Sequence, residues 1–283
     1  MLIARILRLL FNNKNRLRPY MKKVIFSTLA VTFLLLSCKK NKEYNSSVLA
    51  DLTVEFDQVA GSSDLDLNTG SYTNAMGQSF NVTKVKYFVS NFILTNTDGT
   101  VYTVPQDECY FLIDESDLSS HMPLLKVPEG EYKTLSFMIG VDSLRNTMDV
   151  SQRTGVLDVS GAAADMYWTW NSGYIFLKLE GTSPDVSAPG NIFKYHVGGF
   201  GGYSSPTTNN LRTVMLDLTS GGTAKVKSGK STNIYLTVDI LKILNGTTNI
   251  TLGTPTAEVH SPVAGEPLAN NYASMISHDH TEN

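Results

Sequence analysis

The side chains in this chain that could do chemistry are mainly indoles and imidazoles. The only two tryptophans, Trp168 and Trp170, are separated by a single residue, so in a plain strand both indoles would point to the same face. Four of the five histidines follow this pair: His196, His260, His278 and His280. Histidine nitrogens without thiolates suit copper or zinc, but the scattered spacing selects no coordination geometry.

Each of these signals also has a plainer explanation. Paired tryptophans often belong to a core or a ligand platform, and a histidine in a strand is often a satisfied core residue. His196 is followed by Val197-Gly198-Gly199, and glycines let a backbone come close to whatever the imidazole holds. His121 precedes Met122-Pro123 and is interpreted as a loop residue, whereas His278 and His280 lie in a polar tail.

Two residues near these candidates could orient a ligand. Asp142, in Gly140-Val141-Asp142-Ser143, could cap a turn through its carboxylate. The alternative is that this carboxylate holds a ligand histidine in orientation. Tyr195, which directly precedes His196, is a second candidate for such a role.

Composition and motifs exclude several classes of function. Of the 23 basic residues seven lie in the first 37 positions, which hold no acid, so the remainder has 16 bases against 26 acids, or −10. Nucleic acid is therefore not expected as a partner. With 42% hydrophobic and 17% charged residues, the chain is neither disordered nor a multi-pass membrane protein. No nucleophile elbow, phosphate loop or His-Glu-x-x-His motif occurs, which argues against a hydrolase.

The N-terminus has the pattern of an export signal. Lys22-Lys23 precedes an apolar run, Val24–Leu36, that is short for a membrane span of about 20 residues. Leu35-Leu36-Ser37-Cys38 resembles a bacterial lipobox, which implies that Cys38 is lipidated; an uncleaved anchor helix is the alternative. We expect a signal peptide over 1–37, whose true start codon is Met21, and a lipid-anchored tether over 38–50. The protein is then expected in the bacterial cell envelope, at the periplasmic or surface face of the outer membrane.

The remaining chain is expected to form one domain over 51–283. Period-two alternation predicts strands at four places: 52–56, 175–179, 214–218 and Asn233–Leu241. A β-rich stretch over Val82–Thr95, followed by Asp98-Gly99 and Val101–Val104, predicts a hairpin. The pattern indicates an all-β fold, a Greek-key, immunoglobulin-like β-sandwich, with one short C-terminal helix over Glu266–Ile276. Cys109, in the apolar run Cys109–Ile113, is expected to be buried and inert, with a thiolate metal ligand as the alternative.

A longer pattern adds a family resemblance. The segment 167–181 resembles the signature of the MbnP-like copper-binding protein family. It reads Tyr167-Trp168-Thr169-Trp170-Asn171-Ser172-Gly173-Tyr174-Ile175-Phe176-Leu177-Lys178-Leu179-Glu180-Gly181. Further segments resemble that family in the same order, over roughly 50–280: Val54-Glu55-Phe56, Ile139–Ser143, Phe193–Gly199, His260-Ser261-Pro262 and Asn271-Tyr272.

The resemblance implies a lipid-anchored or secreted protein that binds a copper ion, expected as Cu(I). It also implies a partner, a di-haem peroxidase-like enzyme of the MbnH type, that oxidises one tryptophan to kynurenine, so that this chain would be a substrate and not an enzyme. Carried over by position, Trp168 or Trp170 is modified and becomes a ligand, beside His196 and His260. His280 is a third candidate ligand. Val259-His260-Ser261-Pro262 departs from the Met-His-Pro expected there.

Two other classes of function compete with copper binding. One is a carbohydrate- or ligand-binding surface module, in which exposed aromatic rings form a stacking platform; its candidate tyrosines are Tyr72, Tyr87, Tyr167, Tyr174 and Tyr203. The other is a structural module of an envelope assembly. Platform tryptophans would lie open to solvent, whereas convergence of His196 and His260 would favour a metal site.

Overall fold

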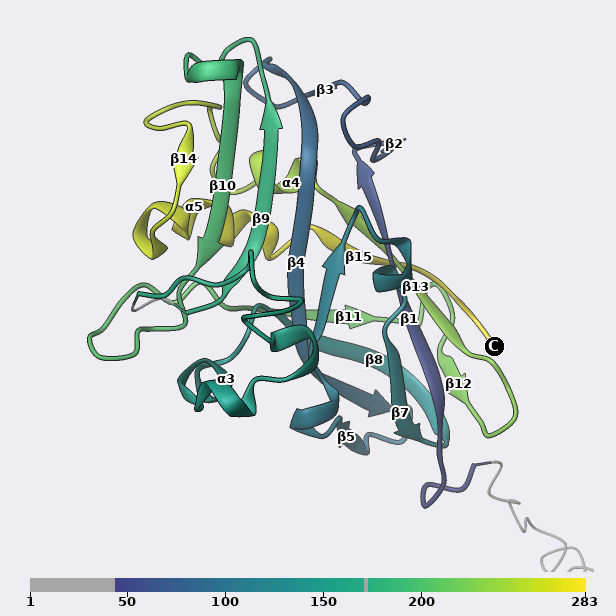
Figure 1. The fold of residues 1–283 in the computed structure, drawn as a ribbon. Helices are drawn as coiled ribbons and strands as arrows, with labels where there is room; N and C mark the ends of the chain where they lie inside the picture. The colour runs from purple at the N-terminus through teal and green to yellow at the C-terminus, as the bar shows by residue number, and fades with distance from the viewer. Residues whose placement is uncertain (1–43, 171–172) are drawn as a thin grey trace, which may run out of the picture. The chain divides into compact units, whose positions relative to one another are not determined.

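Strands dominate the part of the chain described by the computed structural model, residues 44–170 and 173–283 (Figure 1). The all-β prediction with a short C-terminal helix is confirmed. The predicted signal peptide, Cys38 and the tether up to residue 43 lie outside the described residues. Among the described residues, no helix is long and apolar enough to cross a membrane.

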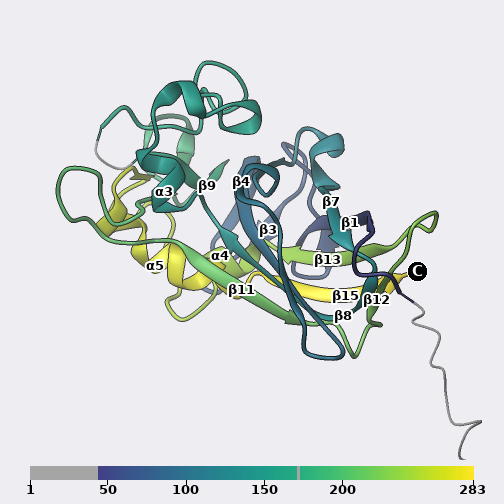
Figure 2. The same cartoon turned by 90° about the horizontal axis from the view of Figure 1, so that it is seen from below.

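One sheet joins the beginning of the domain to its end. Its strands are β1 (Leu49–Ala60), β2 (Ser63–Asp64), β7 (Leu124–Pro128), β13 (Asn233–Asp239) and β15 (Ile276–Glu282). β1 pairs in parallel with β13 from Thr53↔Asn233 to Val59↔Asp239, so segments far apart in the sequence lie side by side (Figures 1 and 2). The alternation that predicted these strands gives no sign of this parallel pairing.

A larger sheet is built around the long strand β4 (Ser79–Asn96). Its order is β11 (Arg212–Asp217), β8 (Gly130–Ile139), β4, β9 (Ile175–Thr182), β10 (Ile192–Gly198) and β14 (Glu258–Val259). Shorter strands pair with β4 or β8: β3 (Tyr72–Thr73), β5 (Val101–Thr103), β6 (Phe111–Asp114) and β12 (Ala224–Val226). The predicted hairpin at Asp98-Gly99 is present, because Thr95 pairs with Val101 and Gly99 has a φ of 91°.

Helical turns fill the connections between strands. The 3-10 turns are η1 (Gln106–Glu108), η2 (Leu118–His121), η3 (Val150–Gln152), η4 (Gly155–Leu157) and η5 (Pro189–Asn191). Two short α-helices, α3 (Ser143–Thr147) and α4 (Leu241–Leu244), precede the longer α5 (Pro262–Tyr272). α5 begins and ends four residues earlier than predicted, because Ser261 caps it and accepts from Ala264 N while Pro262 occupies its first turn. Ile276 instead starts β15.

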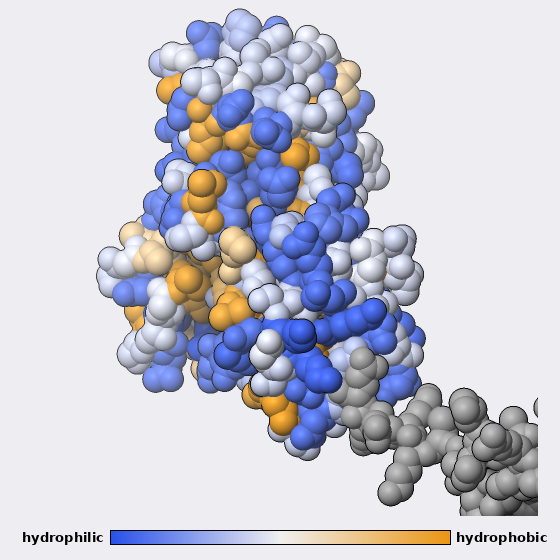
Figure 3. All heavy atoms as spheres, turned by 90° about the vertical axis from the view of Figure 1, so that its right-hand side faces the viewer, coloured by the Kyte–Doolittle hydropathy of each residue, from blue (hydrophilic) through white to orange (hydrophobic). Residues whose placement is uncertain are grey.

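The two sheets pack through aromatic side chains. Phe56 of β1 makes edge contacts with Tyr87 of β4 at 6.3 Å and with Phe137 of β8 at 5.6 Å between ring centroids. Phe137 also stacks on Phe92 of β4 at 5.3 Å. On the face seen in Figure 3 the surface is mainly hydrophilic, with hydrophobic residues in separate patches. Burial of the inward face of each strand therefore holds the sandwich together.

Phe137 provides a test of this core. Replacing Phe137 by Ala should lower the free energy of unfolding by about 3–5 kcal/mol, because the fully buried ring is lost between two aromatic neighbours. Met215→Ala on the adjacent strand β11, where the side chain is 76% exposed, should change it by less than about 0.5 kcal/mol. Urea unfolding measures both, and similar losses for the two variants would contradict the assigned packing.

Candidate metal centre

Two predicted ligands, His196 and His260, lie side by side on one face of the larger sheet. β10 and β14 pair in parallel with Tyr195 opposite Val259, so the next residue on each strand is a histidine. Tyr195 and Val259 are buried and face the core, which turns the two imidazoles to the opposite face. Their ring centroids are 4.8 Å apart at an interplanar angle of 72°.

Each imidazole has a carboxylate partner. Nε2 of His196 lies 2.7 Å from Oε1 of Glu180, and Nε2 of His260 lies 3.2 Å from Oε2 of Glu258. An ionised carboxylate only accepts, so Nε2–H donates and, in a neutral ring, the lone pair is left on Nδ1. Metal-bound histidines usually have such a partner. Glu180 belongs to the tryptophan motif, and Glu258 is two residues before His260. Sequence reasoning missed both carboxylates. For Glu258 the spacing of two residues from a histidine could have indicated the contact.

His196 is held in the form that binds metals. Burial lowers the pKa of His196 to about 4, with the charge of Lys178 acting in the same direction and the hydrogen bond to Glu180 opposing it. Its side chain is 12% exposed, against 43% for that of His260. Near neutral pH the imidazole of His196 is therefore uncharged, and no proton has to leave it before a cation binds.

The two tryptophans lie on a hairpin that extends β9 and not on a plain strand. We call residues 166–170 and 173–175 the tryptophan hairpin. Trp168 N donates to Gly173 O at 2.8 Å, and Tyr167 and Tyr174 form an isolated bridge. The indoles of Trp168 and Trp170 stack at 4.9 Å and 24°. Trp168 is 9% exposed and Trp170 is 47% exposed, so one ring of the pair is buried and the other is open.

Gly198 allows Trp168 to approach the strand that carries His196. A Cβ on Gly198 would lie 2.8 Å from Cζ3 of Trp168 and 2.6 Å from the carbonyl oxygen of Tyr174. The pairing of β9 with β10 shifts register between Val197 and Gly198. Gly198, two residues after His196, thus lets the buried indole reach the end of β10.

The tryptophan hairpin is held by two buried side chains that sequence reasoning missed. Asn146 Oδ1 accepts from Tyr174 N at 2.9 Å, and its Nδ2 donates to the carbonyl of Asp142 at 3.1 Å. Arg153 donates to the hydroxyl of Tyr167 at 2.9 Å, and its guanidinium lies over the ring of Tyr167. Neither residue shows a sequence signal for this role, because the contacts depend on how the 141–153 segment folds back.

Other predicted site residues lie elsewhere. His280 is in β15 of the smaller sheet, where its ring stacks on Tyr235 at 4.3 Å and its Nδ1 lies 2.7 Å from Asp279 Oδ2. His278 contacts Thr281 Oγ1 at 2.9 Å. The supposed polar tail is therefore a strand, because pairing with β13 satisfies its backbone. The structure places His280 with Tyr235 and not with the other candidate ligands.

The two residues considered for orienting a ligand have other partners. Asp142 caps α3 by accepting from Arg145 N at 3.1 Å and also accepts from the Tyr110 hydroxyl, which confirms the turn-capping interpretation. Tyr195 faces the core, where its hydroxyl accepts from Gly253 N at 3.3 Å. Alternation along β10 puts this side chain on the face opposite His196. The orienting carboxylates are Glu180 and Glu258 instead.

The donor atoms fit a soft ion better than a conventional zinc site. Cys109 is 1% exposed, and burial raises the pKa of its thiol, as expected of an inert cysteine. Within residues 44–170 and 173–283, no three His, Cys, Asp or Glu side chains converge as metal ligands. A structural zinc site needs about four such ligands. A pair of imidazoles without further such ligands suits an ion of low coordination number better than a structural zinc ion.

Comparison with known proteins found a matching family model and a similar solved structure. The model of the MbnP family matches residues 49–261, a range that contains the tryptophan hairpin, His196 and His260 but not His280. A solved structure described as MbnP from Methylosinus trichosporium resembles the fold with a TM-score of 0.50 and 17% identity, covering 81% of this chain and 98% of that chain. No curated protein matches the chain.

The depressed pKa of His196 has a measurable effect on stability. Unfolded histidine binds a proton below about pH 6.5, whereas His196 in the fold binds one only near pH 4. Between these values the unfolded state holds more protons, so acidification through this window lowers the free energy of unfolding. Urea unfolding of the protein and of His196→Gln at several pH values measures the effect. The variant should lose less stability on acidification, and equal pH dependence would contradict burial of a neutral imidazole.

Proposed function

The chain belongs to the MbnP family, and from this premise we propose that it is an envelope protein that binds a copper ion through His196 and His260. The single observation that supports this best is the paired imidazoles, 4.8 Å apart, each with its own carboxylate. Neutral nitrogen donors suit Cu(I), and a bound ion would be stored or handed on. The role is therefore binding and not catalysis.

We further propose that Trp168 supplies the third donor after oxidation to kynurenine. Indole is a poor ligand because its nitrogen lone pair belongs to the aromatic ring. Oxidation cleaves the C2–C3 bond and inserts an oxygen atom at each end; it consumes two molecules of hydrogen peroxide, each of which leaves one oxygen atom in the product and one in water. Hydrolysis then releases C2 as formate and leaves an aromatic amine beside a ketone. Trp168 is favoured over Trp170 because it is buried and packs on Gly198, near His196.

The partner in this modification is proposed to be a di-haem peroxidase-like enzyme of the MbnH type. The support is the family membership together with the exposure of Trp170, which is 47% exposed and whose ring stacks on the buried Trp168. The proposed location, anchored through a lipid on Cys38, is supported by the export signal and the lipobox-like Leu35–Cys38.

A second candidate function, binding of a carbohydrate or another small ligand, is supported by one observation. A cavity of about 300 Å³ adjoins the open ring of Trp170 and is also lined by Tyr167, Phe200 and Arg153. Stacking on an exposed indole and hydrogen bonding to a guanidinium would suit such a ligand. Quenching of tryptophan fluorescence by sugars, and its loss in Trp170→Ala, would favour this function. Copper retention that depends on His196 favours the first.

Copper retention tests the histidine pair. Protein co-expressed with the oxidase should keep copper through desalting, and His196→Ala or His260→Ala should each lose it, because a lone imidazole holds the ion weakly. His280→Ala is the matched control, since this imidazole is exposed and stacked on Tyr235, and it should behave like the parent protein. Elemental analysis of metal per protein is the measurement. Retention of copper by His196→Ala would refute the assignment.

Peptide mapping tests which tryptophan is modified. Trypsin cleaves after Arg153 and Lys178, so one peptide carries both indoles, and fragmentation separates them. After exposure to the oxidase, the mass change of kynurenine should fall on Trp168. Trp170→Phe should still be modified, whereas Trp168→Phe should not. Modification confined to Trp170 would show that burial against Gly198 does not select the site.

A further inference from the structure

A polar row crosses the face of the sheet that carries the histidines. Lys86 of β4 pairs with Lys178 of β9, and Lys178 pairs with His196 of β10. Because paired residues project to the same face, lysine side chains lead across the sheet to the imidazole. A cation bound at His196 would therefore lie next to ammonium groups, and their charge has to be balanced.

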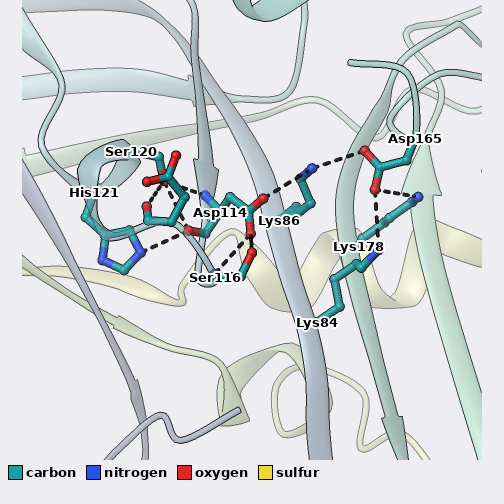
Figure 4. A network of polar contacts seen from close by, with 9 residues as sticks. Lys84, Lys86, Asp114, Ser116, Ser120, His121, Asp165 and Lys178 are labelled. Atoms are coloured by element: carbon teal, nitrogen blue, oxygen red, sulfur yellow. Dashed lines mark hydrogen bonds and ion pairs between the residues drawn. The ribbon is translucent and has the colours of Figure 1, made fainter. Parts of the chain in front are cut away.

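Asp165 balances this charge. Its carboxylate lies 3.1 Å from Lys86 Nζ, 3.4 Å from Lys84 Nζ and 3.5 Å from Lys178 Nζ, and Figure 4 shows it among these side chains. Partial burial alone would raise the pKa of Asp165, but hydrogen bonding to Lys86 and the lysine charges lower it to about 2. The carboxylate is therefore ionised throughout the neutral and mildly acidic range.

The position of Asp165 in the chain gives these contacts a second consequence. Asp165 directly precedes Met166, which is fully buried and begins the tryptophan hairpin. Met166 O accepts from Ile175 N at 2.8 Å, so the entry to the hairpin is tied to the start of β9. A carboxylate fixed by lysines from β4 and β9 thus fixes the point at which the hairpin leaves the sheet.

Loss of the ion pair between Asp165 and Lys178 would cost free energy because the lysine is buried. Its side chain is only 7% exposed, and burial lowers its pKa. Although the Asp165 side chain is 40% exposed, the ammonium of Lys178 is not, so removing the carboxylate leaves a largely buried charge without compensation. With Asn in place of Asp165, the ammonium of Lys178 would gain water only if the 158–166 segment moved away from the sheet.

We propose that Asp165 is a positioning residue, whose contacts with Lys84, Lys86 and Lys178 hold the tryptophan hairpin against the sheet so that the stacked indoles lie beside the histidine pair. The consequence for copper and for tryptophan oxidation rests on the function proposed above. The positioning of the indoles does not, because it follows from contacts within the chain alone.

The chain offers a matched control for this proposal. Lys86 Nζ also lies 3.3 Å from Asp114 Oδ2, at the other end of the same network (Figure 4). Asp114 belongs to β6 and accepts from Ser116, far along the chain from the hairpin. Asp114→Asn and Asp165→Asn therefore remove the same charge from the same lysine, but only the second touches the segment that carries the tryptophans.

Near-ultraviolet circular dichroism of the unmodified protein reads the indole pair directly, since stacked indoles couple electronically. Asp165→Asn should lose most of the tryptophan signal and become cleavable by protease within 158–170, while Asp114→Asn should keep the parent spectrum. In protein treated with the oxidase, Asp165→Asn should also bind copper about 10- to 100-fold more weakly, the usual cost of losing support around a metal ligand.

The possible outcomes separate the two proposals. An unchanged tryptophan spectrum in Asp165→Asn, or an equal loss in Asp114→Asn, would overturn the positioning role. If Asp165→Asn does not fold, Lys178→Met, which removes the buried charge but keeps an apolar stem, takes its place; a weakened tryptophan signal supports the role and an unchanged one overturns it. If the parent protein binds no copper after oxidation, the proposed function fails, while the spectra still decide the role of Asp165.

Discussion

The arrangement of the candidate site depends on a very short parallel pairing, that of β10 with the two-residue strand β14. Two register pairs set His196 abreast of His260, and the surrounding contacts keep them there. Asn210, fully buried, donates to the carbonyls of Gly198 at 2.8 Å and Pro262 at 2.7 Å, which ties the end of β10 to the start of α5. A shift of one residue would turn either imidazole into the core, so this buried amide fixes the register.

Local sequence signals predicted where strands and turns lie better than they predicted which strands pair with each other. Alternation along β13 and the Asp98-Gly99 turn are properties of a few consecutive residues, and both are found as expected. The parallel pairing of β1 with β13 joins the two ends of the domain, and nothing local encodes it. The predicted bounds of α5 were wrong because the hydroxyl of Ser261 caps the helix and starts it four residues earlier.

The same distinction applies to the site. His196 and His260 were singled out through the family resemblance, and their closeness depends on long-range pairing that spacing cannot reveal. His280 looked equally available in the sequence, but its strand joins the other sheet. Glu180 and Glu258 could have been found by period-two reasoning, since each lies on the imidazole face of its strand. Asn146 and Arg153 could not, because they reach the hairpin through an irregular segment.

Electrostatics explains how the proposed cation site and a row of lysines can share one face of a sheet. Burial keeps His196 neutral, so this imidazole brings no charge of its own that would repel a metal ion. The nearest cation, Lys178, shares the carboxylate of Asp165, and Glu180 stands on the other side of His196. Charges this close in a partly buried site are weakly screened, so each ammonium needs its carboxylate nearby. The ion pairs beside the histidines thus influence the free energy with which a positive ion would bind there, although their side chains do not have to contact the ion.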